Sequence, residues 1–319
     1  MRASVALLIA CAAWGLSFPL VRALSLSQQI AVPDAGTWCL SSWCLLLRYV
    51  IGTVLLAACS WGEWRGWRQQ RITAPEWRQA LGLGVFTAGG ALLQMDGLSY
   101  TQASTSAFLT QLYAVWIPLL VVLRTRTLPG WWTGGCLAAV LLGMAILAGL
   151  DPHDLRLSRG EIETVLSSLV FAVQILWAER PAYVANRMTL VALLSFVVSG
   201  ACFIPAVIAT SPTPDVGLRL YADPHHLVLL GLLAAIPTAI GMSLMFRFQR
   251  FVGAVAAGII YCTEPLFAAL FAFVLPGLLS RWLNVDYANE HLTTELTLGA
   301  TLIIAANIAM QLRPKAKIV

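Results

Sequence analysis

The chain has 319 residues, of which 59% are hydrophobic and only 11% are charged. A soluble domain usually carries about 25% charged residues, so this composition excludes a soluble protein and predicts an integral membrane protein. The net charge of +5 is then better explained by orientation in a bilayer than by a nucleic-acid partner, and we expect no such partner.

Apolar runs long enough to cross a bilayer, which takes about 20 residues each, occur ten times along the chain. The first run continues past Cys11, so we do not expect a cleaved lipoprotein leader there. The fold class that follows is an all-α integral membrane protein with ten transmembrane helices. In chain order the expected spans are 3–24, 38–60, 77–97, 101–123, 129–149, 161–180, 189–210, 226–247, 253–275 and 294–312.

The distribution of Lys and Arg between the two sides of the membrane supports ten spans. If both termini are cytoplasmic, fourteen of the 20 Lys and Arg residues lie on the cytoplasmic side and four lie in the loops on the opposite side of the membrane. The other two, Arg22 and Arg48, lie within spans. Cytoplasmic loops of membrane proteins carry an excess of Lys and Arg. We therefore expect a multi-pass protein of the plasma (inner) membrane with both termini in the cytoplasm.

The two halves of the chain share a pattern of loops. Residues 1–150 and residues 151–319 each hold five expected spans, and in each half the third and fourth spans are joined by only a few residues. An odd number of crossings per half turns the second half upside down relative to the first. The sequence therefore predicts two inverted five-helix repeats, an arrangement in which a solute site lies near the middle of the membrane.

Two ionisable residues fall near the centre of expected spans, Arg48 in the second and Glu264 in the ninth. A charge at this depth costs about 2.5–3.5 kcal/mol on insertion scales unless it is paired or hydrated. One interpretation is structural: the two residues, or each with other partners, pin helices together. The other is functional: Glu264 meets an amine or a proton, and Arg48 meets a carboxylate, in an aqueous cavity.

Uncharged polar and aromatic residues are concentrated on a few of the expected spans and suggest the walls of such a cavity. Glutamine amides in lipid need hydrogen-bond partners, so they point toward other helices or water. Each residue taken alone is better explained as a contact between helices than as a ligand contact. Near the outer span ends, Arg22 and Asp96 could form an outer gate or extend toward water, and we expect the latter. The candidate binding residues besides Glu264 and Arg48 are Trp14, Ser17, Gln94, Gln111, Tyr113, Trp116, Gln174, Trp177 and Tyr261.

Signals for other chemistry are weak. The seven cysteines form no C-x-x-C pair, so we expect neither a disulfide framework nor zinc. The four histidines fall in expected outer loops, where we interpret them as solvated residues rather than metal ligands. The sequence contains no nucleotide-binding G-x-x-x-x-G-K-[ST] loop, and we expect no cofactor.

Four stretches carry a family resemblance over nearly the whole chain: AAWGLSFPLVR at 12–22, LRYVIG at 47–52, GLSYTQASTSAFLTQLYAVWIPLL at 97–120 and IIYCTEPLFAALFAFVL at 259–275. In this order they resemble the EamA family of the drug/metabolite transporter superfamily. The resemblance implies a ten-helix, two-repeat secondary transporter that exports small metabolites, amino acids or drugs, and Glu264 with Pro265 matches its Glu-Pro motif. The loop after residue 275 is longer than in that pattern.

We therefore predict a secondary transporter, an exporter that works by alternating access through a cavity in the middle of the membrane. Its partners would be a small-molecule solute, the lipid bilayer and a coupling proton or ion. Two alternatives are a membrane-embedded enzyme, for which no catalytic cluster such as H-E-x-x-H or G-x-S-x-G is found, and a non-transporting membrane sensor or scaffold. The sequence leaves the solute, the direction and the oligomeric state open.

Overall fold

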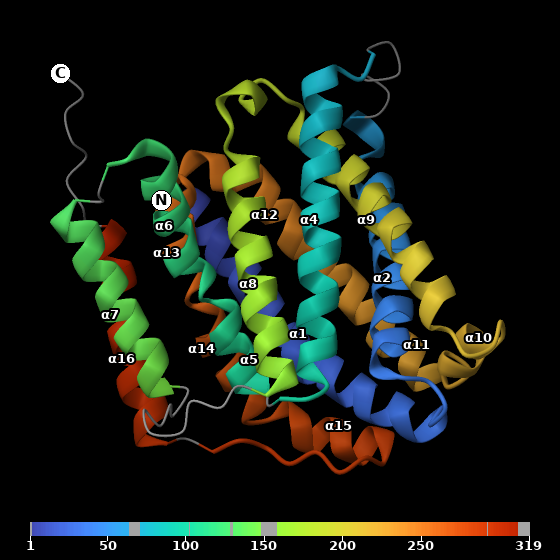
Figure 1. The fold of residues 1–319 in the computed structure, drawn as a ribbon. Helices are drawn as coiled ribbons and strands as arrows, with labels where there is room; N and C mark the ends of the chain where they lie inside the picture. Colours follow the sequence, from blue (N-terminus) through green and yellow to red (C-terminus); the bar gives the residue numbers. More distant parts are fainter. Residues whose placement is uncertain are drawn as a thin grey trace.

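The computed structural model describes residues 2–63, 71–101, 103–127, 130–147, 158–291 and 293–311. Within these ranges every regular element is a helix, and most of the helices run roughly parallel to one another in a bundle (Figure 1). In the first half the helices are α1 (Arg2–Ala31), α2 (Thr37–Cys59), α4 (Ala74–Leu98), α5 (Ala103–Thr110), α6 (Tyr113–Thr125) and α7 (Trp131–Leu147).

The second half has more, shorter elements, because several of its helices are interrupted. Residues 148–157, which include the expected boundary between the halves near residue 150, lie outside the described ranges. The elements are α8 (Arg159–Ala178), η1 (Pro181–Tyr183), α9 (Met188–Thr210), α10 (Val216–Leu220), α11 (Pro224–Leu233), η2 (Ala234–Met242), α12 (Ser243–Phe248), η3 (Gln249–Phe251), α13 (Ala254–Tyr261), α14 (Glu264–Ala272), α15 (Leu275–Leu283) and α16 (Thr294–Gln311).

The prediction of an all-helical, multi-pass membrane protein is confirmed. Among the described residues, eight stretches are long and apolar enough to cross a bilayer, and two apolar helices are shorter, Trp131–Gly143 and Thr297–Ala306. These two belong to α7 and α16, which pack against each other at one side of the bundle (Figure 1). Ten crossings therefore require α7 and α16 to span as well, and that count stays a prediction.

Two of the spanning stretches are broken near their middles, one in each half. The first break lies at Gln111 and Leu112, between α5 and α6, and the second at Cys262 and Thr263, between α13 and α14. Pro265, in the first turn of α14, fits the second break because proline lacks an amide hydrogen to donate. Pro118 lies inside α6 and does not mark the first break.

A seam of glycines lets α4 approach α8 and α9 closely. A methyl group at Gly97 would lie 2.7 Å from the carbonyl oxygen of Gly160, and one at Gly160 would lie 2.5 Å from that of Gly97. At Gly84 a methyl group would lie 2.8 Å from the carbonyl oxygen of Ser195 on α9. Helix association in lipid depends on such close backbone packing.

Ion pairs fasten both ends of α4. At its start Glu76 forms a capping box with Thr73 and also binds Arg187, whose Nε lies 2.7 Å from Glu76 Oε1. Near its end Asp96 is fully buried and pairs with Arg159 at the start of α8, at 2.7 Å. The expectation that Asp96 extends toward water is therefore wrong, because the start of α8 supplies a cation beside it.

Two further outer residues differ from expectation. Arg22 donates from Nη1 to the carbonyl oxygens of Leu98 and Ser99, at 3.1 and 3.0 Å, so it holds the last turn of α4 instead of reaching for water. His226, expected to be solvated, is 1% exposed, and its ring lies 2.7 Å from both Ser27 Oγ and the carbonyl oxygen of Leu220. Both residues act as structural contacts.

The long segment after residue 275 is ordered as helix α15, which lies across the end of the bundle, at the bottom of the view (Figure 1). Pro276 and Leu279 face inward, whereas Leu278 and Trp282 are exposed. The amide of Glu290 donates to the carbonyl oxygen of Ala272 at 2.9 Å, so the chain returns against the end of α14. The extra length therefore forms a helical cover over that end.

Candidate functional site

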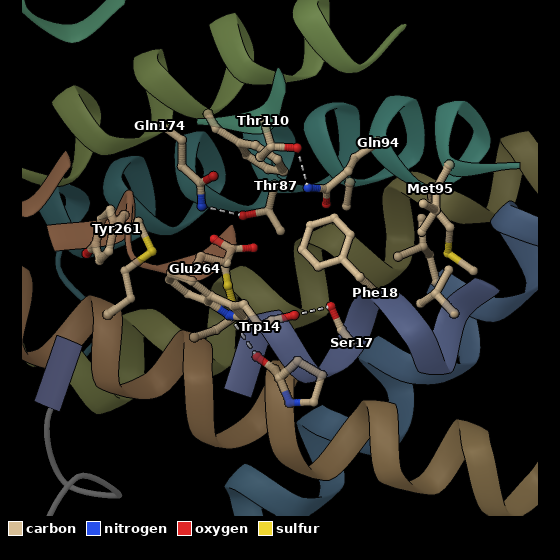
Figure 2. A pocket seen from close by; sticks show the side chains of 18 of the residues that line it. Trp14, Ser17, Phe18, Thr87, Gln94, Met95, Thr110, Gln174, Tyr261 and Glu264 are labelled. Atoms are coloured by element: carbon tan, nitrogen blue, oxygen red, sulfur yellow. Dashed lines mark hydrogen bonds between the residues drawn. The ribbon is translucent and has the colours of Figure 1, made fainter. Parts of the chain in front are cut away.

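A cavity lies in the middle of the bundle, with a volume of about 120 Å³ available to the centres of water-sized molecules. One water needs roughly 10–15 Å³ on this measure, so the cavity has room for several waters or a small solute. Side chains from both halves of the chain line it (Figure 2). Eight of the candidate residues are among them: Trp14, Ser17, Arg48, Gln94, Tyr113, Gln174, Tyr261 and Glu264.

Glu264 is the acid of this cavity. It is the first residue of α14, directly after the break at Cys262 and Thr263, and only 5% of it is exposed. A carboxylate is favoured at a helix start, where backbone N–H groups point outward and the helix dipole is positive. Gln111 donates from Nε2 to Glu264 Oε2 at 3.2 Å. The break thus creates a place for a carboxylate inside an apolar run.

Arg48, on α2, faces the same cavity but does not pair with Glu264. Its Nε donates to Thr238 Oγ1 at 2.5 Å. Within the described part of the chain, neither Arg48 nor Glu264 forms an ion pair within 4.0 Å. The structural interpretation allowed the two residues to pair with each other or each with another partner. The structure shows the second arrangement, in which Arg48 binds Thr238 and Glu264 binds Gln111. The cavity therefore holds a carboxyl group and a guanidinium that do not contact each other.

The partner of Arg48 belongs to an unusual segment. Residues 234–242 form the nine-residue π-helical segment η2, which contains Pro237. The Pro237 carbonyl oxygen accepts a hydrogen bond from Trp14 Nε1 at 3.1 Å. π-Helical segments are rare and occur frequently at functional sites. Here this segment contributes both the Arg48 contact and the Trp14 contact.

Three aromatic residues form one wall of the cavity. Trp14 and Tyr261 meet edge to face with ring centroids 5.5 Å apart, and Tyr113 meets Tyr261 in the same way at 6.2 Å. The Tyr261 hydroxyl donates to Gln249 Oε1 at 3.1 Å. Gln249 in turn donates to the carboxylate of Glu179, at 3.2 Å. The wall is therefore fixed by a hydrogen-bonded chain that leads to the end of α8.

The remaining polar candidates in the cavity already have protein partners. Gln94 donates to Thr110 Oγ1 at 2.9 Å, and Gln174 donates to Thr87 Oγ1 at 2.7 Å (Figure 2). Ser17 donates to the carbonyl oxygen of Trp14 at 2.6 Å. These contacts link neighbouring helices or turns and also hold the polar atoms near Glu264, so the structural and the functional interpretation both apply to them.

Three candidate residues do not line the cavity. Gln111 lies behind Glu264 as its hydrogen-bond donor. Trp116 donates from Nε1 to Ser168 Oγ at 3.0 Å and fastens α6 to α8. Trp177 stands at the end of α8, between Phe86 and Arg180, and lines a separate groove.

Several lining residues gave no signal in the sequence. Phe18, Met95 and Phe171 are apolar residues within apolar spans, so a cavity-facing position cannot be told from a lipid-facing one. Pro237 gave a signal that could have been used, since proline inside a helix disturbs its hydrogen bonding. The others are Val21, Leu45, Tyr49, Thr87, Ala91, Leu98, Thr110, Ile175, Met242 and Met245.

Comparisons with known proteins identify the family and the fold. A family model described as the EamA-like transporter family matches residues 1–149 and 158–282. A crystal structure of another protein superposes with a TM-score of 0.68 at 17% sequence identity, over 98% of this chain and 99% of that one. At this identity the match shows the fold alone. Among curated proteins, none matches the chain.

Proposed function

This chain belongs to the EamA-like transporter family, and from that premise we propose that it is a secondary transporter, an exporter that works by alternating access through the central cavity. The solute is a small molecule with a partly apolar body, a carboxylate that meets Arg48 and an amine that meets Glu264. The observation that carries the proposal is that both charged residues line one cavity without pairing with each other.

The energetics of the two charges support a solute or water between them. An unpaired guanidinium in the middle of a membrane costs several kcal/mol unless an anion or water meets it. Thr238 satisfies the Nε of Arg48, and the planar fork of a guanidinium presents further donors that suit a carboxylate. Trp14, Tyr113 and Tyr261 add apolar surface beside it. A zwitterion with a hydrophobic side group matches this arrangement.

Coupling to protons would act through Glu264 and Gln111. An amide offers both a donor and an acceptor, so Gln111 donates to the ionised carboxylate and, with its amide turned over, accepts from the protonated one. Both protonation states of Glu264 thus keep a buried partner. In the proposed cycle, a proton on Glu264 and the amine of the solute occupy the site in turn, which couples their movements in opposite directions.

The proposed architecture is two inverted repeats, residues 1–150 and 151–319, with ten crossings and both termini on the cytoplasmic side of the plasma membrane. The matched breaks between α5 and α6 and between α13 and α14 support the repeat. The excess of Lys and Arg in the loops assigned to the cytoplasm supports the orientation. Discontinuous helices around a midplane site recur in transporters with inverted repeats.

The test is solute flux in reconstituted vesicles, after a thermal-shift screen of amino acids and related zwitterions on the purified protein has chosen the solute. Glu264→Gln should abolish accumulation driven by a pH gradient but keep solute exchange at zero gradient with a raised KM, because the amine of the solute loses its charged partner. Arg48→Gln should reduce both. Thr301→Ala, on the exposed face of α16, is the control and should match the wild-type protein.

Two outcomes would contradict the proposal. If well-folded Glu264→Gln still concentrates the solute against its gradient, proton coupling does not run through this residue. If well-folded Arg48→Gln and Glu264→Gln both transport at the wild-type rate, the cavity is not the solute path.

A further inference from the structure

A second hollow lies on the outside of the bundle, between α4 and the end of α8. It is a groove of about 460 Å³ available to the centres of water-sized molecules. None of the residues that line it lines the central cavity. Gly82 lines it and gives the Trp177 ring room, because a methyl group at Gly82 would overlap that ring where it lies against α4.

The mouth of the groove is basic. Arg78 on α4 and Arg180 just after α8 both line it and are both exposed. The guanidinium of Arg180 lies over the Trp177 ring, 3.7 Å from its centroid. Within the described ranges, neither arginine forms an ion pair. The groove therefore presents two cations without counter-charges.

The acids nearest in sequence to these arginines, Glu76 and Glu179, already have other partners. Glu76 is held by Arg187 and by its own capping box. Glu179 accepts hydrogen bonds from the backbone amide of Ala254 and from Gln249. Because both carboxylates are engaged elsewhere, neither competes with an external anion for Arg78 or Arg180.

The body of the groove is apolar. Leu81 and Val85 follow Arg78 on the same face of α4, at a spacing of three and seven residues, and are 54% and 46% exposed. Phe86 and Trp177 meet edge to face at 5.8 Å and form the side of the groove. The face thus changes from charged at the helix end to apolar toward the middle of the membrane.

We propose that this groove binds one anionic phospholipid, with the phosphate between Arg78 and Arg180 and an acyl chain along Leu81 and Val85. Basic pockets between transmembrane helices recognise anionic headgroups. Trp177 and Tyr183, which also line the groove, belong to the residue types that sit at headgroup level. A free phosphate would use the mouth alone, whereas a lipid uses both parts. The inference does not depend on what the central cavity transports.

The experiment measures lipid binding to the purified full chain in a neutral detergent, by native mass spectrometry and by thermal shift. The probes are phosphatidylglycerol, phosphatidylcholine with the same acyl chains, and water-soluble glycerol phosphate. We expect a single tightly bound phosphatidylglycerol that raises the melting temperature, and no comparable effect from the other two. Removing one arginine near a headgroup costs about 1 kcal/mol, which corresponds to about fivefold weaker binding.

The variants separate a built site from general surface charge. Arg78→Gln/Arg180→Gln should weaken phosphatidylglycerol binding by well over the roughly fivefold loss, about 1 kcal/mol, expected for either single variant. Arg78→Lys/Arg180→Lys keeps the charge and should keep most of the affinity. Arg124→Gln removes an exposed arginine at the end of α6 and should leave binding unchanged.

Several results would overturn the proposal. They are equal binding of phosphatidylcholine, an equal shift with glycerol phosphate alone, wild-type affinity in the double Gln variant, or an equal loss in Arg124→Gln. If the double Gln variant fails to fold, the two single Gln variants decide, since unchanged affinity in both would equally refute the site.

Discussion

The side-chain amide of Gln111 donates to the carboxylate of Glu264 over 3.2 Å, and this contact joins the two helix breaks of the molecule. Gln111 lies at the break between α5 and α6, and Glu264 opens α14 directly after the break that ends α13. The two residues are 153 positions apart in sequence. The interruptions of the two halves therefore meet at one hydrogen bond beside the central cavity.

Removing Gln111 should destabilise the protein. Gln111→Leu takes away the hydrogen bond of a buried carboxylate, and leaving such a group unsatisfied costs about 1–3 kcal/mol. A double-mutant cycle with Glu264→Leu, read by thermal or denaturant unfolding in detergent, isolates the pair. We expect the loss in the double variant to be smaller than the sum of the single losses. Additivity within about 0.5 kcal/mol would show that the two residues are not coupled.

The close contact between α4 and α8 at Gly97 and Gly160 should tolerate no side chain. In Gly160→Ala the new methyl group meets the backbone of Gly97, which cannot move without separating the helices, and overpacking of this kind costs about 1–3 kcal/mol. Gly134→Ala on α7 is the matched control, because a methyl group there meets nothing within 4 Å.

The melting temperature of purified Gly160→Ala should fall well below that of the wild type. Gly134→Ala should equal or slightly exceed it, since alanine favours a helix over glycine by up to about 1 kcal/mol. Equal melting temperatures for the two variants would refute the close crossing.

Thr238 should act on solute affinity through Arg48. Thr238→Val keeps the shape but removes the acceptor for Arg48 Nε, and a hydrogen bond to a charged group contributes about 1.5–3 kcal/mol. We expect protein stability to fall, because the guanidinium loses its partner, and the KM for a carboxylate-bearing solute to rise about tenfold or more in vesicle flux assays of the folded variant. Thr238→Ser, which restores the hydroxyl, should recover the wild-type KM. No recovery would exclude the hydrogen bond as the cause.

Glu179 should give the folded protein a pH-dependent stability. Burial at the end of α8 raises the pKa of this carboxyl, against the opposing effect of hydrogen bonds from Gln249 and Ala254. The folded state therefore holds the proton more tightly than the unfolded chain. Stability is greatest below the ordinary glutamate pKa of about 4.3 and falls as the pH rises through the folded value.

A single proton changes the free energy of unfolding by at most about 1.36 kcal/mol per pH unit, and in Glu179→Gln this contribution to the pH dependence of stability should disappear. The measurement is unfolding as a function of pH for the wild type, Glu179→Gln and Glu63→Gln, the last being an exposed control. A slope unchanged in Glu179→Gln would show that this proton is not linked to folding.

Much of the fold could be predicted because the signals are large. Twenty apolar residues in succession indicate a crossing whatever their order, and Glu264 and Arg48 stand out because charges inside such runs are rare. The break at Gln111 had no comparable signal, since the nearest proline, Pro118, lies within α6. A glutamine in a span indicates only that it needs a partner, and the partner proved to be in the other half.

The aromatic candidates show why the rest could not be predicted. Trp14 and Trp116 are both tryptophans in the middle of spans, yet the first faces the cavity and the second binds Ser168. An indole ring suits a cavity wall, a buried hydrogen bond and the membrane interface equally well. Only the rotation of each helix about its axis decides among them, and that rotation depends on packing between distant segments.

The two ion pairs of α4 bear on how the molecule can move. Glu76 is held at one end by Arg187 and Asp96 at the other by Arg159, and the glycine seam joins α4 to α8 and α9 in between. A helix that is held at both ends and along its length is expected to move together with its neighbours as one rigid body. We therefore expect the movements that open the central cavity to occur in α1 and α14. These two helices pack against each other outside that seam and carry Trp14 and Glu264, which line the cavity.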